Sequence, residues 1–148
     1  MFELKIQGGE IVSKYKVIYS SMTGNTEKMA NAIKEGIESE GSFVDFIEVK
    51  NATQKDIDEA SGVAFGCPAF GVEVLSDEMA GYISTINIQE KPIILFGSYE
   101  WGNGEWMKDW EVVMKKSGAN LKSEGLIVHM TPSKKDIEKC HALAKKLL

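Results

Sequence analysis

Five short apolar runs along the chain predict β-strands, because each is compact and bounded by glycine, proline or polar residues. They span Tyr15 to Ser20, Ser42 to Val49, Gly62 to Cys67, Ile93 to Phe96 and Leu126 to Val128. Residues 42 to 49 alternate between two faces and are expected at a sheet edge, whereas the run that Pro68 closes is apolar throughout and is expected at the centre.

Stretches of helical periodicity separate these runs. Met29, Ile33 and Ile37 fall four residues apart and share one helical face. Helices are predicted over Thr26 to Ser39, Lys55 to Glu59, Leu75 to Ile86, Glu105 to Ser117 and Lys134 to Leu148. Strands that alternate with helices predict an α/β fold, with a parallel sheet covered by helices on both faces.

The first fourteen residues follow a different pattern. Phe2, Leu4 and Ile6 alternate with polar residues, and Gly8-Gly9 resembles a tight hairpin turn. The strand that begins at Tyr15 is expected to be flanked on both sides, which leaves no free edge for a hairpin. We therefore expect residues 1–14 to form an extension, as an edge strand or a tail, and residues 15–148 to form one domain.

Composition adds expectations about location. The 148 residues are 43% hydrophobic, enough for one substantial core, and no apolar run approaches the ~18 residues that cross a membrane. Cys67 and Cys140 lie far apart in a chain without a signal pattern at its N-terminus, which indicates a reduced, cytoplasmic setting. His129 and His141 form no ligand-spaced cluster with them, so no metal site is predicted.

Negative charge is concentrated in one part of the chain. The net charge is -5, and residues 73 to 111 hold eight acidic side chains against two lysines, a net of -6. This argues against nucleic acid as a partner and favours docking of positively charged proteins. These carboxylates could equally serve only to keep the protein surface hydrated, without docking a partner.

The segment from Ser20 to Thr26 is the clearest candidate for ligand binding. It is a loop rich in hydroxyls and glycine between a predicted strand and a predicted helix, where free backbone N–H groups bind anions. It contains no lysine, unlike the phosphate loop of nucleotide hydrolases. A single phosphate held by neutral donors fits this loop.

Two aromatic residues follow the next strands of the predicted sheet. Phe70 and Trp101 each sit beside a glycine in a loop, where a planar ligand could lie between apolar walls. A lid over the protein's own core is the alternative for either residue alone. Trp106 and Trp110, four residues apart, are expected to pack inside a helix. The loops together predict a flat ring joined to one phosphate.

Over residues 15 to 148 the sequence resembles the short-chain flavodoxins. Three segments carry the resemblance in order and spacing: Ser21 to Thr26, Gly66 to Glu73, and Phe96 to Gly102 with Trp106 beyond. The resemblance implies a three-layer fold with a five-stranded parallel sheet of order 2-1-3-4-5, and non-covalently bound FMN.

The resemblance also implies a set of site residues. Ser21 to Thr26, assisted by Ser98, would hold the phosphate, Phe70 and Trp101 would flank the flavin ring, and the Glu73 carboxylate would accept from flavin N3–H. The implied cofactor-binding residues are Ser21, Met22, Thr23, Gly24, Asn25, Thr26, Ala69, Phe70, Gly71, Val72, Glu73, Ser98, Tyr99, Glu100, Trp101 and Gly102.

Three positions are expected to tune the flavin potentials. Gly71 would supply a peptide that reorients toward reduced flavin, since glycine tolerates positive φ. Val72 and Glu100 depart from the family pattern: a β-branched residue restricts the turn, and a carboxylate disfavours added negative charge unless solvent screens it. The hypothesis for Val72 is a changed spacing of the two one-electron potentials, which redox titration of Val72→Asp would test.

The expected function is therefore that of a low-potential one-electron carrier. It would cycle mainly between the FMN semiquinone and hydroquinone, act as a monomer and dock redox partner proteins transiently through its acidic surface. No catalytic residue is needed. The alternative is an FMN-dependent quinone or nitro reductase on the same fold. A response-regulator module is disfavoured, because the first strand ends in Ser20-Ser21 and not in clustered aspartates.

Overall fold

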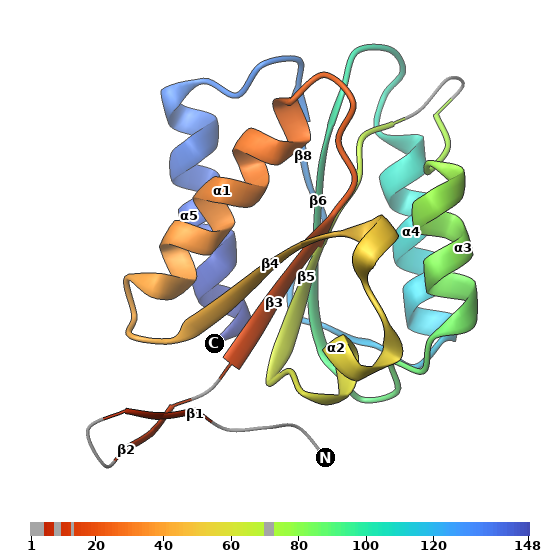
Figure 1. Ribbon diagram of the computed structural model, residues 1–148. Coiled ribbons are helices and arrows are strands. Elements are labelled where there is room, and N and C mark those ends of the chain that lie inside the picture. The colour runs from red at the N-terminus through yellow and green to blue at the C-terminus, as the bar shows by residue number, and fades with distance from the viewer. Residues whose placement is uncertain (1–4, 8–9, 13, 70–72) are drawn as a thin grey trace.

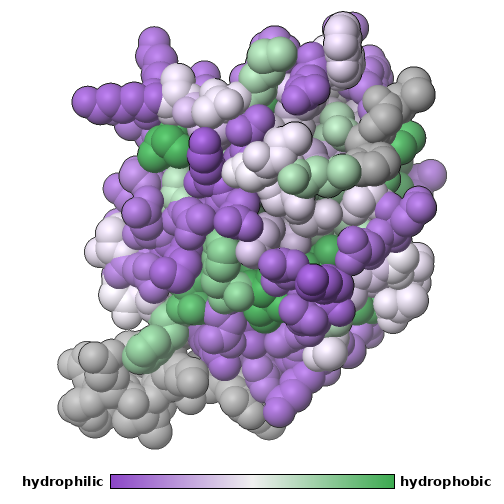
Figure 2. Space-filling model, turned by 45° about the horizontal axis from the view of Figure 1, so that its top comes forward, coloured by the Kyte–Doolittle hydropathy of each residue, from purple (hydrophilic) through white to green (hydrophobic). Residues whose placement is uncertain are grey.

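The main body of the protein has three layers, with helices on both faces of a parallel sheet (Figure 1). The structure is a computed structural model that describes residues 5–7, 10–12, 14–69 and 73–148. Large hydrophobic side chains are mostly buried in two clusters, one on each side of the sheet. Over the face drawn in Figure 2, hydrophilic side chains predominate and hydrophobic ones form small patches between them.

The sheet has the predicted strand order. Its strands are β4 (Phe43–Glu48), β3 (Lys14–Tyr19), β5 (Gly62–Gly66) and β6 (Pro92–Tyr99), followed by β8 (Leu126–His129), which pairs with the second half of β6. All of these pairs are parallel. In order of appearance this is 2-1-3-4-5, so the fold class is confirmed.

Helix α1 (Asn25–Glu38) and helix α5 (Lys134–Leu147) cover one face of the sheet side by side (Figure 1). The opposite face is covered by α3 (Asp77–Thr85) and α4 (Glu105–Lys116), with the short elements η1 (Val49–Asn51) and α2 (Gln54–Asp58) nearby. The predicted faces are correct: Met29, Ile33 and Ile37 are fully buried, and Trp106 and Trp110 pack inside the second cluster.

Two features of the sheet differ from the prediction. A sixth strand, β7 (Asn120–Leu121), pairs with the start of β6, and its two residues are too few to give a pattern. Strand β6 continues through Ser98 and Tyr99, three residues past the predicted end at Phe96. Gly97, inside this strand, is a site of close packing, since a Cβ there would clash with the carbonyl oxygen of Cys67.

The N-terminal segment forms a separate hairpin. Strands β1 (Lys5–Gln7) and β2 (Glu10–Val12) pair antiparallel with each other in a two-stranded sheet of their own. The hairpin lies beside the N-terminal end of β3 (Figure 1), which itself begins at Lys14, one residue earlier than predicted. Within the described residues, no helix is both long and apolar enough to cross a membrane.

A buried ionic cluster lies at the end of the sheet where β3 begins. The Nζ atom of Lys16 is 2.8 Å from Asp45 Oδ2 and 3.0 Å from Glu59 Oε2, and Lys16 is only 1% exposed. Lys14 Nζ lies 2.9 Å from the same Asp45 oxygen. Burial alone would lower the pKa of Lys16, but the bonds to Asp45 and Glu59 outweigh it and the pKa is raised.

The same contacts act on the carboxylates. Burial tends to raise the pKa of Asp45, yet its bonds to Lys16 and Lys14 prevail and lower it. The bond from Lys16 is the main cause of the lowered pKa of Glu59. Carboxylates whose pKa is lowered by folding stabilise the protein above their ordinary pKa, and this contribution is lost as the pH falls through their folded values.

Replacing Lys16 should therefore destabilise the protein in a pH-dependent way. We expect Lys16→Met to lower the free energy of unfolding by about 2 kcal/mol at neutral pH, because Asp45 and the largely buried Glu59 lose their most buried cation and share only Lys14. The loss should shrink as the pH falls below about 4 toward the lowered folded pKa values of Asp45 and Glu59, where the two carboxylates become protonated. Urea unfolding followed by circular dichroism at both pH values measures it.

The matched control is Lys34→Met, which removes an exposed pair with Glu38 one helical turn away. This variant should change the free energy of unfolding by only about 0.5 kcal/mol at either pH. Equal losses in the two variants, or a loss at Lys16 that does not change with pH, would contradict the role given to the buried cluster.

Candidate cofactor site

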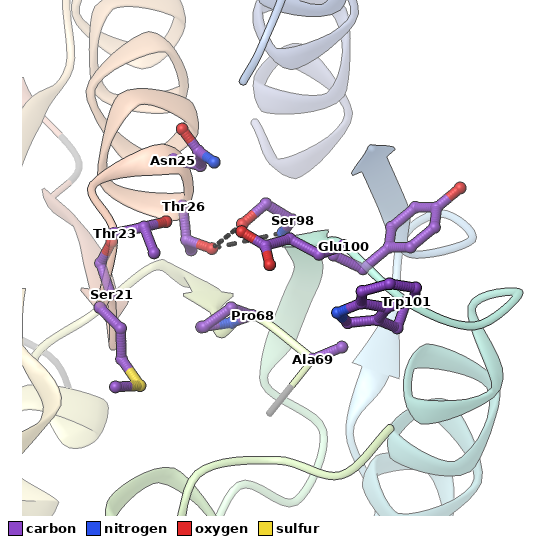
Figure 3. Close-up of a pocket in the computed structure, with 11 residues that line it drawn as sticks. Ser21, Thr23, Asn25, Thr26, Pro68, Ala69, Ser98, Glu100 and Trp101 are labelled. Atoms are coloured by element: carbon purple, nitrogen blue, oxygen red, sulfur yellow. Dashed lines mark hydrogen bonds between the residues drawn. The ribbon is translucent and has the colours of Figure 1, made fainter. Parts of the chain in front are cut away.

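A cavity of about 410 Å³ lies at the carboxyl ends of the central strands (Figure 3). Three segments from distant parts of the chain line it: the loop after β3, the segment after β5, and the end of β6 with the residues that follow. The lining residues are Ser21, Met22, Thr23, Asn25, Thr26, Pro68, Ala69, Ser98, Tyr99, Glu100 and Trp101. The chain runs from β3 outward to β4 and then back across to β5, so the cavity occupies the point where the strand order reverses.

The loop after β3 leads directly into helix α1. Gly24 precedes the helix with a φ of 93°, a left-handed conformation that glycine adopts without strain. No side chain caps the helix at Gly24, although Ser21 Oγ accepts from the backbone N–H of Glu27 at 3.2 Å. The start of α1 thus has the form of an anion site, with the hydroxyls of Ser21, Thr23 and Thr26 around it.

A hydrogen bond across the sheet joins this loop to β6. The hydroxyl oxygens of Thr26 and Ser98 lie 2.8 Å apart, and the backbone N–H of Ser98 also donates to Thr26 Oγ1 at 3.3 Å (Figure 3). Both residues are buried. Two hydroxyl groups that are 72 residues apart in the sequence therefore lie together at the cavity. Such a contact is what we expect if Ser98 assists the phosphate loop.

The other end of the cavity is apolar and open. Trp101 is 79% exposed and lies on the same side of the cavity as Ala69 (Figure 3). The backbone N–H of Ala69 donates to the Ser98 carbonyl at 3.0 Å, which fixes that side to β6. An indole that is left this exposed next to a cavity offers a face on which a planar ring can stack.

Glu100 brings a carboxylate to the same space. Its side chain extends from the Trp101 side of the cavity toward Thr26 and Ser98 (Figure 3). Glu100 is nevertheless exposed, so water and salt weaken its effect on a bound ligand.

The structure gives Glu73 a contact that the sequence did not predict. Its Oε1 atom accepts hydrogen bonds from the backbone N–H groups of Asn103, Gly104 and Glu105, at 3.2, 2.9 and 2.8 Å. These groups lie at the start of α4, whose N-cap residue, Gly104, has no side chain to cap the helix. Glu73 therefore caps α4 from 30 residues away, and favourable alignment with the helix dipole stabilises its charge.

The predicted site residues divide into three groups. Ten of them line the cavity: Ser21, Met22, Thr23, Asn25, Thr26, Ala69, Ser98, Tyr99, Glu100 and Trp101. Gly24, Glu73 and Gly102 are near it without lining it, and Gly102 packs against the Glu73 side chain. Phe70, Gly71 and Val72 lie outside the described residues. Pro68 lines the cavity but was only predicted to end a strand; the one signal for it was its place in the Gly66 to Glu73 segment.

A doubly wound parallel sheet with a hydroxyl-rich phosphate loop and an exposed tryptophan at its switch point defines a protein that binds a phosphorylated, planar ligand. The sequence profile of the flavodoxin family matches residues 17–142. The chain belongs to the flavodoxin family.

Individual relatives agree with this assignment. The chain is 38% identical to the flavodoxin of Clostridium beijerinckii over 135 residues, which covers 89% of this chain and 97% of the relative. A solved flavodoxin from the domain Archaea superposes with a TM-score of 0.81 at 29% identity, covering 90% of this chain and 95% of the other. The chain is also 28% identical to the nitric oxide reductase of Moorella thermoacetica, covering 94% of this chain but 36% of that larger protein.

Flavodoxins are electron-transfer proteins that bind FMN and pass electrons to partner proteins, so this chain is an FMN-binding electron carrier. The described residues fit that cofactor. The cavity volume is within the usual range of about 300 to 1,000 Å³ for small-molecule sites. Its polar donors are neutral hydroxyls beside a helix N-terminus, and its open end carries an aromatic wall.

The cap that Glu73 places on α4 leads to a stability prediction. In the FMN-free protein we expect Glu73→Ala to lower the free energy of unfolding by about 1.5 kcal/mol, because three backbone donors lose their acceptor. Glu73→Gln should lose about half as much, since it keeps an acceptor oxygen but not the charge. Urea unfolding measures both variants.

The control is Glu124→Ala, at an exposed carboxylate before β8 at the opposite end of the sheet. It should leave the free energy of unfolding within about 0.5 kcal/mol of the parent. If Glu73→Ala were as stable as this control, the cap would not contribute to the fold.

Proposed function

We propose that this protein is a low-potential one-electron carrier that cycles mainly between the semiquinone and hydroquinone of non-covalently bound FMN. The observation that carries the proposal is the single cavity that joins the hydroxyl-rich start of α1 to the exposed face of Trp101. When bound, FMN supplies the electron chemistry, and the protein contributes binding, orientation and electrostatics.

We assign the phosphate to Ser21 through Thr26 with the help of Ser98, and the ring to the space beside Trp101, with Phe70 as its second wall. Within the described part of the chain, Glu73 Oε2 has no hydrogen-bond donor, while Oε1 holds α4. One carboxylate can therefore cap the helix and accept from flavin N3–H at the same time. We keep the remaining predicted residues, including Gly71 and Val72, as part of the site.

Acidic side chains near the cavity support transient docking of basic redox partners. Asp77 and Glu78 are exposed in the first turn of α3, and Glu105 is exposed in the first turn of α4. Helices of a parallel α/β fold begin at the carboxyl ends of the strands, which is the end that holds the cavity.

If this acidic surface docks partners, electron transfer to a basic redox protein should slow as the salt concentration rises. A rate independent of salt would count against it.

We favour the carrier over the FMN-dependent quinone or nitro reductase, because the flavodoxin of Clostridium beijerinckii matches this chain over 97% of its own length. The Cys67 thiol near the site is 0% exposed, and burial raises its pKa despite hydrogen bonds with Ser76, so we assign it no reactive role. We also propose a monomeric state and a cytoplasmic location, supported by two free, buried cysteines.

The family match and the pairing of the N-terminal strands also support a division of the chain. We propose that residues 1–14 are an extension and that residues 15–148 form the FMN-binding domain. The family profile starts at residue 17, and β1 pairs with β2 in a sheet apart from the main one, which support this division.

A stepwise reductive titration tests the function directly. The protein loaded with FMN should show a long-wavelength neutral semiquinone during reduction, because a one-electron carrier separates the two potentials. Direct reduction by a nicotinamide cofactor with turnover of a quinone would instead establish the reductase. A colourless protein that rejects added FMN would eliminate both.

The position of Glu100 predicts an effect on the more negative potential. We expect Glu100→Gln to raise that potential by about 20 mV at low salt, because it removes a charge from the cavity wall; this is the effect of a unit charge on the order of 8 Å away in a water-like medium. The shift should fade near 1 M salt, where the screening length drops to about 3 Å. Potentiometric titration at both salt concentrations measures it, with Glu124→Gln as the remote control. An equal shift in the control, or none at Glu100, would refute the electrostatic role.

A further inference from the structure

The wall of the cavity that carries Glu100 and Trp101 is supported from behind by β8. Tyr99, the last residue of β6, pairs in register with His129, the last residue of β8. The backbone N–H of Met130 donates to the Tyr99 carbonyl at 2.8 Å. This is the last backbone hydrogen bond between the two segments before the chain enters the Trp101 loop.

A side chain continues the pairing by one residue. The Nε2 atom of His129 lies 3.1 Å from the backbone carbonyl oxygen of Glu100. A carbonyl can only accept, so the ring must carry its proton on Nε2 and donate it. His129 thus holds the first residue of the loop, beyond the end of the sheet.

The imidazole ring of His129 also packs against Tyr99, a residue that lines the cavity. Its ring centroid is 5.0 Å from that of Tyr99, and the Tyr99 ring in turn lies 5.6 Å from Trp106. Trp106 is 1% exposed, and its Nε1–H donates to the Cys67 carbonyl at 3.3 Å. A continuous set of contacts therefore runs from His129 to Cys67, which directly precedes the cavity-lining residues Pro68 and Ala69.

The backbone after His129 is held in an unfavourable conformation. Met130 has a φ of 61°, which a residue with a side chain adopts only where its surroundings impose it. Its N–H bond to Tyr99 is one such restraint. This turn ends β8 at His129 and fixes the backbone from which the imidazole reaches Glu100.

We propose that His129 is a positioning residue for the cofactor site. It anchors the near end of the segment from Glu100 to Glu105, while Glu73 anchors the far end through Asn103, Gly104 and Glu105. Trp101 lies between the two anchors and is 79% exposed, so the backbone and not side-chain packing determines its place. The effect on FMN rests on the proposed function; the effect on the loop does not.

The variants separate the hydrogen bond from the ring contact. His129→Gln keeps an N–H donor at a similar reach, and His129→Phe keeps a ring against Tyr99 but cannot donate. The matched control is His141→Phe, at the only other histidine, which lies on α5 beside Glu35 of α1. Urea unfolding of each variant first establishes that its global stability is close to that of the parent.

Two measurements decide the proposal. In FMN-free protein, hydrogen exchange at the amides of residues 100–102 should be about fivefold faster in His129→Phe than in the parent, because the loop has lost one anchor. In FMN titrations, the same variant should raise Kd about fivefold. His129→Gln and the His141→Phe control should stay within about twofold of the parent in both measurements.

Parent-like exchange in His129→Phe would overturn the proposal, and so would equal changes in His129→Gln and His129→Phe, since the donor would then not matter. Faster exchange with an unchanged Kd would also overturn it, because the anchor would not serve the cofactor site. If the parent itself rejected FMN, the proposed function would fail, and the exchange measurement alone would decide whether His129 holds the loop.

Discussion

Parallel pairing of β3, β5 and β6 is the constraint on which the rest of the structure depends. Tyr19 pairs with Gly66, and Gly66 pairs with Phe96, so β3 and β5 end at the same level of the sheet, three residues before the end of β6. Backbone hydrogen bonds continue past that level from Ser20 to Gly66 and from Ala69 to Ser98. Three loops that are distant in sequence are therefore delivered to one place, and the chemistry of the site follows from what each loop contributes.

The loops are joined to one another as well as to the sheet. Thr26 and Ser98 connect the phosphate loop to β6, Glu73 connects the segment after β5 to α4, and the Trp106 indole donates to the Cys67 carbonyl. These contacts hold the walls of the cavity to one another. The buried lysines at the start of β3 contribute to stability at the opposite end of the sheet, away from the cavity.

Most of the fold could be predicted because its signals are local. Apolar runs such as residues 62–66 and the fourfold spacing of Met29, Ile33 and Ile37 report burial and periodicity directly, and both are read from neighbours in the sequence. The sequence pattern falls short where distant contacts decide. The predicted strand stops at Phe96, but β6 continues to Tyr99, where it pairs with β8. Lys16 is charged, but it is buried because Asp45 and Glu59 arrive from two other elements.

The sequence by itself determined the order of the elements, the hydroxyl-rich loop before α1 and the resemblance that pointed to FMN, because these depend on residue types at fixed spacing. Only the tertiary structure decided that Thr26 meets Ser98, that Glu73 caps α4 and that His129 reaches Glu100. Each of these contacts joins residues 29 to 72 positions apart. Such pairs leave no local pattern, since their geometry exists only once the strands have paired and their carboxyl ends have been brought together.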